Sequence, residues 1–190
     1  MMFRDLVLKN RSYRRFDESK AIERETLLDL VELARVTPSG GNLQALKYIV
    51  SCDVETNERI FATLAWAGYL KEWGGPVQGE RPTGYIVLLH DRSIKANAGV
   101  EPGIAAQTMA LGAVERGLGC CMLGAIQRDK LRAVLGIADE FEIALVLALG
   151  VPVETVVIDP VGADGSIKYW RDAAGVHHVP KRALDEILID

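Results

Sequence analysis

The sequence lacks the features that mark secreted or membrane-embedded proteins. Of its 190 residues only three are cysteines, Cys52, Cys120 and Cys121. An odd count with two adjacent members is a poor disulfide framework, so we expect a cytoplasmic protein. No segment reaches the ~18–20 consecutive apolar residues that a membrane span needs. Residues 1–10 carry charges at close intervals, so we also expect no secretion signal.

The chain also lacks a net positive charge. Twenty-two basic residues stand against 26 acidic residues, for a net charge of −4. Proteins that bind nucleic acid usually carry a basic domain, so we expect no nucleic-acid partner. Metal-binding spacings are missing too, because His177 and His178 are adjacent and no Cys-x-x-Cys pair occurs. We therefore expect no metal site.

The composition that remains is typical of a globular domain. Hydrophobic residues make up 49% of the chain and charged residues 25%. Helical and strand-like patterns alternate without a linker, an internal repeat or a shift in composition. We therefore expect one domain over residues 1–190, of the α/β or α+β class.

Hydrophobic periodicity predicts where the elements lie. A short helix is possible at residues 3–9, and the chain is expected to become irregular after Pro152. The helix expected near 103–116 is apolar almost all round, which is typical either of the centre of a core or of a subunit interface. The other expected helices are 19–36, 56–73 and 127–135, with a last amphipathic segment near 184–188, and the expected strands are 48–52, 85–90 and 141–149.

A cluster of cations near the N-terminus stands out in this acidic chain. Lys9, Arg11, Arg14 and Arg15 follow one another with no acid between them, and Ser12 adds a hydroxyl donor. Arginine presents a planar fork of donors that matches phosphate or carboxylate groups. Such a run forms either solvated surface or one side of an anion site.

Two further segments are candidates for ligand binding. The turn-rich loop 38–44 lies between a helix and a strand and carries two amide side chains, Asn42 and Gln44. The glycines of 117–124 follow a helix and open a strand. A dinucleotide-binding fingerprint has the opposite order, so we reject a Rossmann site. These glycines either permit a tight turn or let a backbone N–H approach a flat ligand.

The order and spacing of these segments resemble the flavin-dependent nitroreductase family. Residues 11–16 match its N-terminal motif, although Asn10 stands where many members have an arginine. Residues 38–44 match a Pro-Ser-x-x-Asn-x-Gln loop, which here continues with Ala45-Leu46 instead of Pro-Trp. The 117–124 segment is similar to the family's Gly-Leu-Gly strand, and Lys181-Arg182 are similar to its C-terminal cations.

The resemblance implies an α+β sandwich with a central mixed, mainly antiparallel sheet flanked by helices, in an intertwined homodimer. It implies an FMN-dependent oxidoreductase that uses NAD(P)H to reduce a small-molecule acceptor, such as a nitroaromatic, quinone or enone. Hydride passes through the flavin N5 atom, so no side chain need be a catalytic acid or base. Two alternatives stay open: a flavin- or nucleotide-binding module without turnover, and another flavin chemistry such as dehalogenation.

The family pattern also assigns roles to residues. The N-terminal motif would hold the phosphate and the N1/O2 edge of the ring, and the C-terminal cations would complete the phosphate site. The loop would bind the ring and ribityl chain from the partner subunit, and the backbone N–H of residue 124 would face N5. The cofactor-binding residues expected on this basis are Arg11, Ser12, Arg14, Pro38, Ser39, Asn42, Gln44, Leu123, Gly124, Lys181 and Arg182.

Overall fold

The centre of the molecule is a four-stranded antiparallel sheet, called here the main sheet. The computed structural model describes residues 2–189. The strands of the main sheet follow the order β1-β2-β4-β3. They are β1 (Leu46–Ser51), β2 (Gly84–Asp91), β3 (Gly119–Leu123) and β4 (Phe141–Gly150). β2 pairs with β1 on one side and with β4 on the other, so the two longest strands lie in the middle of the sheet.

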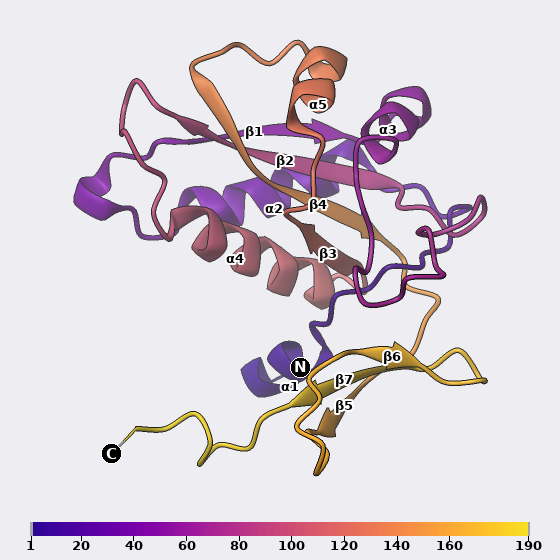
Figure 1. Ribbon diagram of the computed structural model, residues 1–190. Helices are drawn as coiled ribbons and strands as arrows, with labels where there is room; N and C mark the ends of the chain where they lie inside the picture. The colour runs from indigo at the N-terminus through magenta and orange to yellow at the C-terminus, as the bar shows by residue number, and fades with distance from the viewer. Residues whose placement is uncertain (1, 190) are drawn as a thin grey trace.

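Helices cover both faces of the main sheet, as Figure 1 shows. They are α2 (Arg24–Arg35), α3 (Val54–Phe61), α4 (Glu101–Glu115) and α5 (Arg128–Leu135). Successive side chains of a strand point to opposite faces of the sheet, so β2 contributes residues to two hydrophobic cores. Ile86 and Leu88 pack with α2 and α4, whereas Tyr85 and Val87 pack with α3 and α5. The predicted α+β class, with an antiparallel sheet flanked by helices, is therefore confirmed.

Helix α4 is buried on one side and open on the other. Small residues let α2 approach it closely: a Cβ added at Gly112 would lie 2.5 Å from the Cδ1 atom of Leu33. A stripe containing Gly103, Ile104 and Gln107 remains exposed within the single chain. The helix is therefore not buried on every side by its own chain, and its role in a subunit interface stays a prediction.

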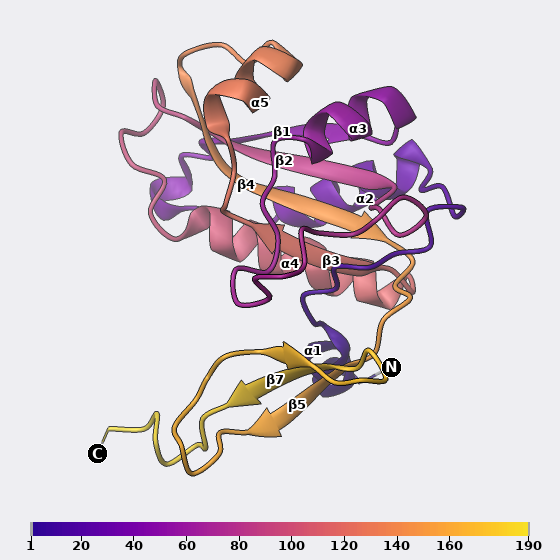
Figure 2. The same ribbon diagram turned by 45° about the vertical axis from the view of Figure 1, so that its right-hand side comes forward.

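A second sheet follows the main sheet in the sequence and is called here the small sheet. Its strands are β5 (Val156–Pro160), β6 (Trp170–Arg171) and β7 (His177–Lys181), in the order β5-β7-β6. β7 runs parallel to β5 and antiparallel to β6. In the views of Figures 1 and 2 the small sheet lies below the main sheet and its helices, and α1 (Phe3–Lys9) lies between the small sheet and α4. The expectation of an irregular chain after Pro152 was therefore wrong. Hydrophobic pattern did not reveal these strands because they are short and lack a continuous apolar run.

Three helix predictions also need correction. α2 begins at Arg24 rather than 19, because the Asp17 carboxylate accepts hydrogen bonds from the backbone and hydroxyl of Ser19 and holds that segment in a turn. The helix predicted over 56–73 ends at Phe61, and Trp66 beyond it packs into the core. Residues 185–187 form a turn instead of a final helix.

Candidate functional site

The predicted N-terminal cations lie beside β3, at the edge of the main sheet. The backbone N–H of Tyr13 donates to the carbonyl oxygen of Cys120 at 3.1 Å, so this segment runs alongside the strand. A cavity of about 380 Å³, called here the Arg14 cavity, opens between the segment, α4 and the small sheet. Its walls are Asn10, Arg11, Ser12, Arg14, Gln107, Ala110, Cys120, Met122, Tyr169, His177, Val179 and Lys181.

A buried carboxylate fixes the backbone of the cationic segment. Glu154 Oε1 accepts hydrogen bonds from the backbone N–H groups of Arg14 and Arg15, the latter at 3.2 Å. Its Oε2 atom accepts a hydrogen bond from Arg171 Nη2 at 2.8 Å. The Arg15 side chain turns away and pairs with Glu80, with 2.7 Å between Nε and Oε2. Glu154 therefore holds the backbone of this segment without occupying the Arg14 side chain.

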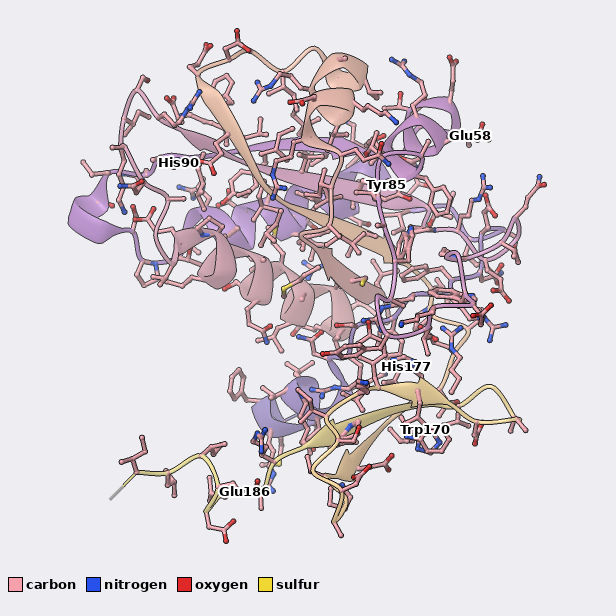
Figure 3. All side chains as sticks on the ribbon, in the orientation of Figure 1. Glu58, Tyr85, His90, Trp170, His177 and Glu186 are labelled. Atoms are coloured by element: carbon pink, nitrogen blue, oxygen red, sulfur yellow. The ribbon has the colours of Figure 1, made fainter. Side chains whose placement is uncertain are left out.

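Two residues that line the cavity, Arg11 and His177, carry buried donors without partners among the residues described. Arg14 Nη1 lies 3.2 Å from His177 Nε2, and a guanidinium can only donate, so the His177 proton must reside on Nδ1. Burial, with the charge of Arg14 next in importance, lowers the pKa of His177 to about 4. Within residues 2–189, neither His177 Nδ1 nor the buried Arg11 Nε has a hydrogen-bond partner. Figure 3 shows His177 on the side of the small sheet that faces the main body. Such a set of donors suits an anion.

The predicted loop lies at the other end of α4. Pro38, Ser39 and Gln44 line a separate cavity of about 270 Å³, called here the loop cavity. The Ser39 hydroxyl donates to Glu101 Oε2 at 3.2 Å and accepts from the Gln44 backbone N–H at 2.9 Å. A hydrogen bond from Lys95 lowers the pKa of Glu101, so this carboxylate is ionised where it holds the loop.

Backbone conformation sets the loop apart. Between Ser39 and Gln44 it contains η1 (Gly40–Asn42), a single turn of 3-10 helix. Asn42 and Gln44 adopt positive φ angles of 53° and 52°, values that are uncommon for residues other than glycine. The loop is thus a constrained structure and not an extended connection.

Residues of the two predicted groups line separate cavities, and each cavity includes a residue of α4. Gln107 lines the Arg14 cavity and Glu101 lines the loop cavity. Gln107 lies six positions after Glu101, which is about 9 Å along the helix axis. Leu123 ends β3 as a buried residue, and Gly124 follows it. What these residues bind is not tested by their positions, so the assignment stays a prediction.

The two predicted C-terminal cations, Lys181 and Arg182, lie in different surroundings. Lys181 lines the Arg14 cavity together with Arg11, Ser12 and Arg14. Arg182 is not among the lining residues, and its Nη1 atom lies 3.3 Å from Glu186 Oε2 on the surface. The structure therefore brings four of the predicted residues together around one cavity and leaves Arg182 outside it.

Three residues at this site were missed by the sequence prediction. Glu154, Tyr169 and His177 all come from the segment expected to be irregular. The ring of Tyr169 contacts two other residues of the site: its centroid lies 4.9 Å from Arg14 Cζ and 5.2 Å from the centroid of the His177 ring. The available signal was the recurrence of aromatic and cationic residues after 168, where His177 was considered only as part of the His177-His178 pair, whose spacing rejects a metal site.

Residues 2–189 were also compared with what a membrane-spanning helix and a metal-binding cluster require. Within residues 2–189, no helix is both long and apolar enough to cross a membrane. In the same part of the chain, no group of three or more His, Cys, Asp or Glu side chains is arranged to hold a metal ion.

Comparison with known proteins places the chain in a family. The model of the nitroreductase family matches residues 7–80 and 70–151. This chain therefore belongs to the nitroreductase family. No curated protein sequence matches it.

Solved structures share the fold. The nitroreductase family protein of Streptococcus pneumoniae TIGR4 is 17% identical, with a TM-score of 0.72 and 100% of each chain covered. A structure from Desulfovibrio desulfuricans in complex with FMN is 23% identical, with a TM-score of 0.71, covering 98% of this chain and 94% of that one. The FMN-dependent nitroreductase of Clostridium difficile R20291 is 21% identical, with a TM-score of 0.63, covering 78% and 87%.

Proposed function

We propose that this chain is an FMN-dependent oxidoreductase that uses NAD(P)H to reduce small electron-poor acceptors, such as nitroaromatics, quinones or enones. In this proposal residues 1–190 act as one flavin-binding domain in a cytoplasmic homodimer. The observation that carries it is the Arg14 cavity, whose buried N–H groups on Arg11 and His177 lack partners among the residues described. The terminal phosphate of FMN carries nearly two negative charges and several acceptor oxygens, which fit such donors.

The chain's own residues would bind and orient the cofactor. Arg11, Arg14 and Lys181 supply charge, Ser12 supplies a hydroxyl, and the neutral His177 donates through Nδ1. Because Glu154 already holds the backbone at Arg14, little ordering would be needed on binding. Three findings support the assignment: the membership of the chain in the nitroreductase family, FMN bound in one structure of the same fold, and a second structure of this fold that is named an FMN-dependent nitroreductase.

The loop residues complete the proposed site from a second copy of the chain. Ser39 and Asn42 are assigned to the ring and ribityl chain bound by the partner subunit. Two features support this arrangement: the loop and the Arg14 cavity lie in separate hollows, and α4 between them has an uncovered stripe that includes Ile104.

Bound FMN supplies hydride acceptance and donation at its N5 atom, so the protein contributes position and electrostatics. Gly124 follows β3 with only the Leu145 side chain near its would-be Cβ, at 4.0 Å. The absence of a side chain there leaves the backbone N–H accessible to a flat ring. No acid or base is required of the side chains around it.

The test begins with the visible spectrum. The purified protein should take up added FMN, and NADH or NADPH should bleach it under anaerobic conditions. A protein that takes up no FMN would contradict the proposal, and uptake without bleaching would favour a binding module. Arg14→Ala should weaken FMN binding by about tenfold or more, because it removes a charge-assisted contact. Arg59→Ala, whose side chain donates to the carbonyl of Val134 and lines neither the Arg14 cavity nor the loop cavity, is the matched control and should bind FMN as the wild type does.

A further inference from the structure

A third cavity lies on the side of the main sheet that carries α3, away from the Arg14 cavity. It has a volume of about 250 Å³ and is lined by α3, the chain after β1, the segment before β2 and the segment before α2. We call it the Tyr85 pocket. None of its lining residues belongs to the proposed flavin site. Its lining includes two carboxylates, a thiol, a guanidinium and two aromatic rings, which belong to Glu18, Glu58, Cys52, Arg81, Phe61 and Tyr85.

Tyr85 leaves a hydroxyl group unpaired in this pocket. The residue is only 1% exposed, and its hydroxyl oxygen has no hydrogen-bond partner within residues 2–189. Burial raises the pKa of Tyr85, so the hydroxyl keeps its proton and can donate. A buried hydroxyl without a partner destabilises a protein, and its presence calls for a ligand or water that accepts from it.

Arg81 adds a second donor at the same place. Its buried Nε–H also lacks a partner among the described residues. The nearest carboxylate contact of its guanidinium is weak, with 3.6 Å between Arg81 Nη1 and Glu58 Oε1. Figure 3 shows Tyr85 in the central sheet and Glu58 on α3 at the same end of the molecule. Two residues that line this one pocket, Tyr85 on β2 and Arg81 just before it, therefore each carry a buried donor without a partner in the described part of the chain.

The walls of the pocket favour a flat ligand. The Arg81 guanidinium lies over the Phe61 ring, with 4.5 Å from Cζ to the ring centroid. Stacked planar groups of this kind present a flat surface that accommodates another ring. Ala21, Val54 and Pro82 add apolar lining. The shape and polarity match a small ring with one polar end.

The charge balance of the pocket disfavours an anion. Glu18, a carboxylate at the wall of the pocket, accepts hydrogen bonds from the backbone N–H groups of Gly79 and Arg81. With Glu58 it places two carboxylates against the single guanidinium of Arg81. A ligand with a full negative charge would meet like charges, whereas a neutral carbonyl oxygen would accept from both donors without that repulsion.

We propose that the Tyr85 pocket binds a small, flat, uncharged carbonyl compound, of which an aromatic carboxamide is the simplest class. The carbonyl oxygen accepts hydrogen bonds from the Tyr85 hydroxyl and from Arg81 Nε, and the ring lies against the Phe61–Arg81 wall. This site is separate from the flavin site and does not depend on it.

Benzamide and benzoate form a matched pair of probes, because they share shape and differ in charge. Titration of the full chain by isothermal calorimetry should show saturable binding of benzamide, at least tenfold tighter than benzoate. Cys52 lines the pocket and is partly exposed, whereas Cys120 and Cys121 are buried. Benzamide should therefore slow alkylation of Cys52 by iodoacetamide.

Two variants locate the binding. Tyr85→Phe keeps the volume and removes the hydroxyl, so it should weaken benzamide at least tenfold without lowering the melting temperature of the free protein. Arg81→Gln should weaken benzamide as well. Arg59→Gln is the control, because its side chain points from α3 to the carbonyl of Val134. All three variants should take up FMN as the wild type does, which keeps this test distinct from that of the flavin site.

Several results would overturn the proposal. Among them are no saturable benzamide binding, benzoate binding as tight as benzamide, or undiminished binding in Tyr85→Phe. A crystal structure soaked in benzamide that shows only ordered water between Tyr85 and Arg81 would overturn it too.

Discussion

The main sheet and the small sheet are stabilised by different forces. Every residue of β2 is buried, and apolar cores lie on both faces of the main sheet. In the strands of the small sheet only His177 is buried. Its contacts are polar: Glu154 pairs with Arg171 at 2.8 Å, and His178 lies 2.7 Å from Asp159. Hydrophobic burial does not titrate, whereas the contact of His178 does, because its hydrogen bond with Asp159 raises the pKa of His178.

The proposed flavin site depends on both sheets. One wall of the Arg14 cavity comes from β3 and α4, and the other comes from Tyr169, His177 and Lys181 near or within the small sheet. A change that loosens only the small sheet should therefore open the cavity while the main core persists. The predictions below test this contrast, from the largest expected effect to the smallest.

The largest effect is expected in the main sheet. Leu147 is fully buried in the central strand β4. Leu147→Ala should lower the free energy of unfolding by about 4 kcal/mol, through lost burial and the cavity left behind. Urea denaturation followed by far-UV circular dichroism measures it. A loss below about 1 kcal/mol would show that the core is not the main source of stability.

A somewhat smaller and more local effect is expected at Glu154. Its side chain is fully buried and pairs with Arg171, so Glu154→Gln leaves a charged group poorly compensated. We expect a cost of about 3 kcal/mol, confined to the small sheet. Hydrogen exchange should show faster amide exchange in β7 and unchanged protection in β2, and FMN binding should weaken.

The control for Glu154 is Glu80→Gln, which removes the partner of Arg15 outside the Arg14 cavity. This variant should leave exchange in β7 close to that of the wild type. Equal loosening of β2 and β7 in Glu154→Gln would mean that the two sheets unfold as one unit.

Acid should loosen the small sheet before the main sheet. Burial lowers the pKa of His177 from 6.5 to about 4, so the open state binds a proton that the closed state excludes. Stability of the small sheet should therefore fall as the pH drops from about 6.5 towards 4. Exchange of β7 amides, corrected for the intrinsic pH dependence, measures it, and His177→Gln should flatten the response.

The neighbouring His178 should respond in the opposite sense. Its hydrogen bond with Asp159 raises its pKa above 6.5. Its contribution is therefore complete below pH 6.5 and is lost as the pH rises through the raised pKa. His178→Gln should match the wild type at high pH and fall below it near pH 6. The ring of Trp170 stacks on His178 at 4.1 Å, so its fluorescence reports this contact.

The smallest effect is expected at Arg182. This residue is half-exposed and pairs with Glu186 outside the Arg14 cavity. Arg182→Ala should change the free energy of unfolding by no more than about 0.5 kcal/mol and FMN affinity by less than about twofold. Lys181→Ala, one position earlier and at the cavity wall, should weaken FMN by about tenfold. Equal losses in the two variants would return Arg182 to the proposed site.

The hydrophobic pattern of the sequence was sufficient to predict the strands that lie in the middle of the main sheet. The apolar runs at 85–90 and 141–149 predicted β2 and β4 within about two residues, because a central strand buried on both faces needs apolar side chains throughout. The order of the motifs predicted the nitroreductase family, which is confirmed. Helix ends were predicted less well, since side-chain hydrogen bonds such as those of Asp17 decide where a helix begins.

The central strands, the family and the cationic segment at Arg11–Arg14 could be predicted from the residues alone, because each depends on neighbouring residues or on a motif. The surroundings of Arg14 could not, since they are set by the folding of distant segments. Glu154 lies 140 positions from Arg14 and His177 lies 163 positions away, and no local pattern records such a contact. The unpaired hydroxyl of Tyr85 became visible in the same way, because pairing is a property of the space around a group and not of its place in the chain.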